Sequence, residues 1–151
     1  MNQPIQNKSA ATQSAPALRL KDKIGRVLMT IVVLLTLAAF ADGVHRMVLA
    51  GPDRIWVETW RTFGYVVFVG LFALLALRPR NMPALWELVM GHKLAVSIYG
   101  LWLGSEILDA AIATKIDLVL VSLIALAWVL CRGWMAWSVW RAADPIEELL
   151  H

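Results

Sequence analysis

The sequence has almost none of the residues and motifs that build the common catalytic sites of soluble proteins. It has one cysteine, Cys131, which excludes an internal disulfide and a cysteine-based zinc site. It contains no Gly-x-Ser-x-Gly turn, no phosphate-binding loop and no dinucleotide fingerprint. No histidine stands at a spacing from a serine that suggests a Ser-His-Asp set. The sequence therefore gives no support to an enzymatic function.

Long charge-free hydrophobic runs are also missing. A membrane-spanning helix needs roughly 20 mostly apolar residues. Yet 60% of the residues are hydrophobic, against about 45–50% in soluble domains. We therefore predict an integral membrane protein whose helices carry ionisable side chains, and such side chains usually face a protein interior or a water-filled cavity. The four charge-free runs are Val27–Ala41, Thr62–Leu77, Leu94–Ser105 and Leu118–Cys131.

The predicted fold is all-α, an integral membrane four-helix bundle. The turn signals Gly51-Pro52, Arg78-Pro79 and Met82-Pro83 separate the apolar segments. The polar residues 1–23 are expected to form a disordered tail, and 142–151 a short C-terminal tail. The four spanning helices are predicted over about 24–49, 56–77, 83–111 and 115–141.

The first apolar segment has an alternative interpretation. A basic stretch, an apolar core and Ala39-Phe40-Ala41 together resemble a signal peptide with its cleavage site. Apolar residues resume at Val44 and Met47, and the region before the core is long for a signal peptide. We expect a retained first span, with cleavage as the alternative.

The basic residues predict the orientation of the bundle. With the N-terminus in the cytoplasm, ten of the 14 Lys and Arg residues lie in inside segments. Cytoplasmic segments of membrane proteins carry such an excess, so both termini are expected to be cytoplasmic. The net charge of +3 is small and spread out, which argues against a nucleic-acid partner. The four outside basic residues are Arg46, Arg54, Arg61 and Lys115.

Several ionisable residues within the predicted spans are candidates for ligand binding. His92, Tyr99 and Glu106 are seven residues apart and share one stripe of the third predicted helix. His92, Lys93 and Arg132 are expected at similar depth, where they would form an electropositive pocket for an anionic lipid headgroup or a quinone carbonyl. Two alternatives stay open. The stripe could be a hydrogen-bonded interior seam without a ligand, and Arg132 could snorkel to the headgroups or pair with Glu87.

A metal site is a weaker candidate. Asp42-x-x-His45 and Glu106-x-x-Asp109 both have the three-residue spacing found in di-metal helix bundles. The alternative for Asp42 and His45 is an interfacial position with Arg46 as an ion-pair partner. The sequence identifies no cofactor.

The break Arg78-Pro79-Arg80-Asn81-Met82-Pro83-Ala84-Leu85-Trp86, together with chain size and helix count, resembles the small four-helix bacterial inner-membrane proteins, including the DoxX-like group. The resemblance covers Ile24–Arg141 at the level of hydropathy. It implies a multi-pass protein of the bacterial inner membrane, and it carries over no functional residue.

These observations favour a non-enzymatic accessory or assembly subunit of a membrane complex. Small size, little extramembrane mass and the glycines of the third predicted helix motivate this hypothesis. The expected partners are the lipid bilayer and either other membrane subunits or further copies of the chain. The alternatives are a redox-linked membrane anchor that binds a quinone, lipid or metal, and a small transporter or proton path.

Overall fold

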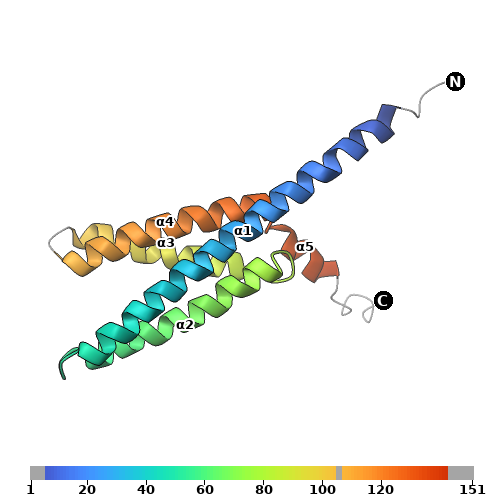
Figure 1. Ribbon diagram of the computed structural model, residues 1–151. Helices are drawn as coiled ribbons and strands as arrows, with labels where there is room; N and C mark the ends of the chain where they lie inside the picture. Colours follow the sequence, from blue (N-terminus) through green and yellow to red (C-terminus); the bar gives the residue numbers. More distant parts are fainter. Residues whose placement is uncertain (1–5, 105–106, 143–151) are drawn as a thin grey trace, which may run out of the picture.

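The computed structural model describes the backbone of residues 6–104 and 107–142. The described residues form helices and no strand. Figure 1 shows the first four helices running back and forth in chain order, with a short fifth helix where the fourth ends. The helices are α1 (Gln6–Leu49), α2 (Ile55–Leu77), α3 (Leu85–Leu103), α4 (Leu108–Cys131) and α5 (Met135–Ala142).

The helices do not pack equally against one another. α1 packs along both α2 and α4, and α3 packs along α4, whereas α2 and α3 touch at few positions. α2 and α3 are therefore the two outer helices, each packed mainly along one neighbour.

Backbone hydrogen bonds or a positive φ mark the ends of α1, α3 and α4. Gly51 accepts hydrogen bonds from the backbone N–H groups of Arg54 (3.0 Å) and Ile55 (2.9 Å), which turns the chain from α1 into α2. α3 ends at Gly104, which has φ 79°, a conformation that glycine adopts without steric cost. α4 ends at Arg132, which is left-handed with φ 56°, and the N–H of Gly133 bonds to Trp128 O. This bond pattern closes the C-terminus of many helices.

The third and fourth helices differ from their predicted bounds. The predicted break near residues 111–115 lies at 104–107 instead, because Gly104 stops α3 and α4 already begins at Leu108. The predicted fourth helix to residue 141 is divided by Arg132 and Gly133 into α4 and α5.

The predicted polar tail differs as well. α1 begins at Gln6, because adding residues to an existing helix costs little once a nucleus has formed. Residues 17–20 are exposed, so this part of α1 extends beyond the bundle (Figure 1). The C-terminal tail from residue 143 lies outside the described residues.

Three helical segments among the described residues are long and apolar enough to cross a membrane: Ala17–Leu49, Ile55–Leu77 and Ala110–Cys131. Only 22%, 17% and 28% of their most apolar windows are buried. Soluble monomers rarely expose so much contiguous apolar surface, and this surface is typical of a membrane protein. α3 falls outside this set because it carries Glu87, His92 and Lys93 among its 19 residues.

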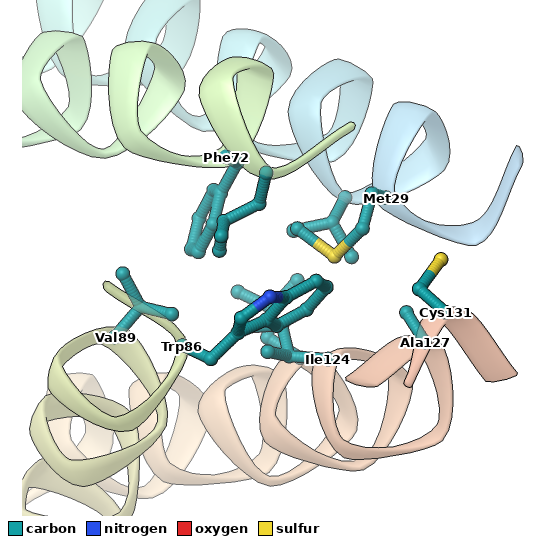
Figure 2. Close-up of a cluster of buried hydrophobic side chains, with 10 residues drawn as sticks. Met29, Phe72, Trp86, Val89, Ile124, Ala127 and Cys131 are labelled. Carbon is teal, nitrogen blue, oxygen red and sulfur yellow. The ribbon is translucent and has the colours of Figure 1, made fainter. Parts of the chain in front are cut away.

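The hydrophobic core joins all four long helices. Figure 2 shows Trp86 of α3 among Met29 of α1, Phe72 of α2 and Ile124 of α4, all fully buried. The Trp86 indole N–H donates to Pro79 O at 2.8 Å, which fixes the α2–α3 turn to the core. This core fills the part of the bundle nearer the α2–α3 turn.

An arginine network closes the same end of the bundle. Asp22 of α1 accepts from Arg80 at 2.6 Å and from Arg26 at 3.3 Å. Arg26 also donates to Leu77 O at 2.8 Å, and Arg80 to Cys131 O at 2.9 Å. Two guanidinium groups thus bind the C-terminal carbonyls of α2 and α4, where a positive charge is favourable. We call this end the basic end; its basic residues are Arg19, Lys21, Lys23, Arg26, Arg78, Arg80 and Arg132.

Candidate functional site

A buried ion pair joins α3 to α4. Lys93 Nζ lies 2.7 Å from Asp117 Oδ1, and the two side chains are 9% and 11% exposed. Lys93 is about 12–15 Å from either end of α3. Removing two charges from water is costly, and their mutual attraction offsets that cost only at close contact. The pair neutralises both charges in the middle of the bundle.

Phe68 of α2 covers the ion pair from the side. Lys93 Nζ lies 4.8 Å from the centroid of the Phe68 ring, a cation–π distance. The His92 ring packs on the same phenyl ring at 4.7 Å. These contacts connect α2 and α3, which otherwise touch little.

The interior beyond the ion pair, away from the basic end, is polar. We call this region the polar half. Each hydroxyl there donates to a carbonyl four residues earlier in its own helix, at 2.7–2.8 Å. The hydroxyl protons are therefore satisfied locally, as is common for Ser and Thr inside helices. The buried hydroxyl residues are Thr36, Thr62, Ser97 and Thr114.

Two glycines allow the helices to approach closely in the polar half. A Cβ on Gly100 would collide with Thr114 Oγ1, and a Cβ on Gly43 would lie 2.8 Å from Thr62 Oγ1. Small residues have this role where membrane helices pack. By contrast, nothing lies within 4 Å of a Cβ built on Gly91, so only Gly100 of these two α3 glycines serves packing within the chain.

A second acidic group is buried near the start of α2. The Glu58 side chain is 6% exposed and binds Arg61 at 3.2 Å and Arg54 at 3.4 Å. On α1, exposed Asp42 binds Arg46 at 2.6 Å. These acidic residues thus form ion pairs with arginines three or four residues away along the chain.

The predicted electropositive pocket is not assembled. Lys93 is level with Asp117, whereas Arg132 follows Asp117 by about 15 residues, or roughly 22 Å along α4. Arg132 is exposed and makes no ion pair with the described residues. Glu87 accepts a hydrogen bond from the Trp137 indole at 3.2 Å, rather than pairing with Arg132.

The predicted polar stripe of α3 lies on another face of the helix. His92 and Tyr99 are exposed, and the Tyr99 ring packs on Trp102. The buried face holds Lys93, Ser97 and Gly100, one residue further along. Glu106 lies outside the described residues.

The proposed metal ligands are not brought together by what the structure describes. Asp42 and His45 are exposed on α1, while Glu106 and the Asp109 side chain lie outside the described part. Within the described residues, no group of three or more His, Cys, Asp or Glu could hold a metal ion.

Asp117 is a residue of this site that the sequence analysis did not predict. A signal for the pairing exists: Lys93 precedes the α3 end Leu103 by about as many residues as Asp117 follows the α4 start Leu108. Two antiparallel helices place such residues side by side. This pairing can be predicted only when the ends of α3 and α4 are placed correctly, at Leu103 and Leu108.

The site thus has an inner and an outer face. On the inner face of α3, Lys93 is neutralised by Asp117 within the chain. On the outer face, the neighbouring His92 makes no hydrogen bond to any described residue. The inner face holds the bundle together, and the outer face is available to another molecule. Comparisons with protein-family models, with curated proteins and with solved structures find no match to this chain.

Proposed function

We propose that this chain is a multi-pass membrane protein with four spans that acts as a non-enzymatic accessory or assembly subunit of a membrane complex. α3 is the fourth span in this proposal. With its inner charge neutralised by Asp117, it crosses the bilayer against α4. The excess of basic residues at the basic end supports a cytoplasmic location of both termini.

The observation that carries the proposal is the imidazole of His92. It is exposed on the outer side of α3, near the middle of the helix, and its described contact is with the Phe68 ring. In hydrocarbon, a polar side chain without a hydrogen-bond partner is costly. A neighbouring membrane helix that offers a partner removes this cost.

The surroundings of His92 support a helix as the covering element. Gly91 and Ala95 are exposed, four residues apart, and lie on the outer side of α3. A Cβ on Gly91 meets nothing within 4 Å, so the space beside it is not filled by this chain. Small residues at this spacing allow a second helix to approach closely, and His can hydrogen-bond across the interface.

Photo-crosslinking in native membranes tests this proposal. A benzophenone side chain is placed at Ala95, on the outer side of α3, and as a control at Leu34, which is 60% exposed near the middle of the apolar segment Ala17–Leu49. We expect a discrete protein adduct from position 95 and lipid adducts alone from position 34. His92→Leu should weaken the adduct at 95 without lowering the thermal unfolding temperature.

Two results would overturn the proposal. Lipid adducts alone at position 95 would show that α3 faces the bilayer. An adduct with a second copy of this chain, and with no other protein, would show a homo-oligomer in place of a subunit of a mixed complex.

A further inference from the structure

The short helix α5 has one apolar and one polar side. Ala136 is buried against the bundle, and Trp137 donates to Glu87 at the start of α3. The rest of the apolar side is uncovered by the chain, with Val139 45% and Trp140 51% exposed. Ser138 and Arg141 lie on the opposite side.

The uncovered apolar surface of α5 lies close to positively charged residues. α5 begins three residues after Arg132, beyond the left-handed turn that ends α4. It therefore lies at the basic end, where the described basic side chains outnumber the acidic Asp22 and Glu87. Asp22 is itself bound by Arg26 and Arg80, so the remaining field is positive.

We propose that α5 lies in the plane of the membrane surface and, with Arg132 and Arg141, binds anionic lipid headgroups. Its uncovered Val139 and Trp140 side chains enter the boundary between headgroups and acyl chains, which the amphipathic tryptophan ring prefers. An amphipathic helix with basic residues binds an anionic surface through buried apolar area and electrostatic attraction together. Charge complementarity thus favours a lipid surface over an apolar protein partner.

Depth measurements on the full chain in vesicles test this proposal. Nitroxide labels are placed at Val139→Cys and Ser138→Cys in a Cys131→Ser background, in phosphatidylcholine vesicles with and without phosphatidylglycerol. We expect the label at 139 to be accessible to oxygen and shielded from a water-soluble nickel complex. The label at 138 should show the opposite accessibility.

A second measurement tests the contribution of the two arginine charges to lipid binding. In native mass spectrometry of the full chain, the ratio of retained phosphatidylglycerol to phosphatidylcholine should fall about fivefold for each of Arg132→Gln and Arg141→Gln. Lys115→Gln, an exposed change at the other end of the bundle, should leave the ratio unchanged.

Three outcomes would overturn the proposal. Equal exposure of both labels to water would place α5 above the membrane. Shielding of the label at 139 from both oxygen and nickel would show that protein, and not lipid, covers α5. An equal loss of retained lipid in Lys115→Gln would remove the role of the two arginines.

Discussion

Lys93 and Asp117 are each costly alone and tolerable together. Their charges lie 2.7 Å apart with about a tenth of each side chain exposed. The surroundings include the Phe68 ring and the helix backbones, which solvate an ion poorly. At the residue scale, the stability of the bundle therefore depends on both charges being present or both being absent.

A double-mutant cycle tests this dependence. Lys93→Met and Asp117→Leu should each lower the free energy of unfolding by about 3–5 kcal/mol, since each leaves one buried charge unpaired. The double variant should be more stable than either single variant, because no charge remains. The measurement is unfolding in detergent micelles, followed by tryptophan fluorescence. If the two single effects simply add, the pair does not determine stability.

On α3, an outward-facing residue and an inward-facing residue are next to each other in the sequence. The sequence alone therefore does not show which of the two faces the bundle. His92 and Lys93 are neighbours, yet one faces outward and the other inward. His92 and Tyr99, seven residues apart, are both exposed on α3, whereas α3 ends at Leu103, before Glu106. Spacing alone does not state which face meets the rest of the bundle, and that depends on the packing of α3 against α4.

At the scale of the element, α3 and α4 are held in register by a close contact. Gly100 lies directly against Thr114, and no side chain larger than hydrogen fits without movement. Together with the ion pair, the contact fixes the two helices at two levels along their length.

Gly100→Ala should therefore lower the free energy of unfolding by about 1–3 kcal/mol, the usual cost of overpacking. Gly91→Ala is the matched control, because a Cβ there meets nothing and alanine favours the helix by up to about 1 kcal/mol. Adding Thr114→Ala should recover part of the loss in Gly100→Ala, since the colliding hydroxyl is removed. Equal effects of the two glycine substitutions would argue against a close helix contact.

Helix ends show which sequence signals are unambiguous. α1 ends at Leu49 and α2 at Leu77, the residues at which Gly51-Pro52 and Arg78-Pro79 predict the stops. The α3 end was missed because a single glycine such as Gly104 can serve packing or a positive φ, and the sequence does not distinguish them. The end of α4 was missed because Arg132 has no intrinsic preference for its left-handed conformation.

At the scale of the whole molecule, the question is whether α3 crosses the membrane. Three helical segments of the described chain are long and apolar enough to span a membrane. α3 differs from them by the charges of Glu87 and Lys93, and the ion pair with Asp117 neutralises the charge of Lys93. Four crossings place the α2–α3 turn and the α3–α4 turn on opposite sides of the membrane.

Cysteine labelling with a membrane-impermeant thiol reagent tests this topology. In a Cys131→Ser background, Asn81→Cys should react only from the cytoplasmic side. Asp53→Cys and Ile107→Cys, both exposed positions, should react only from the other side. If Ile107→Cys and Asn81→Cys react from the same side, α3 does not cross and the four-span proposal fails.

The arginine network at the basic end has a consequence for biogenesis. Arg26 meets its acceptor Leu77 O as soon as α2 has been synthesised, so the α1–α2 hairpin can be completed on its own. Arg80 must wait for Cys131 O, about 50 residues later. At about 5–20 residues per second of translation, this interval is roughly 3–10 seconds. Until then the hydrogen bond from Arg80 to Cys131 O is missing from the hairpin. The insertion of α4 is therefore the step that completes the arginine network.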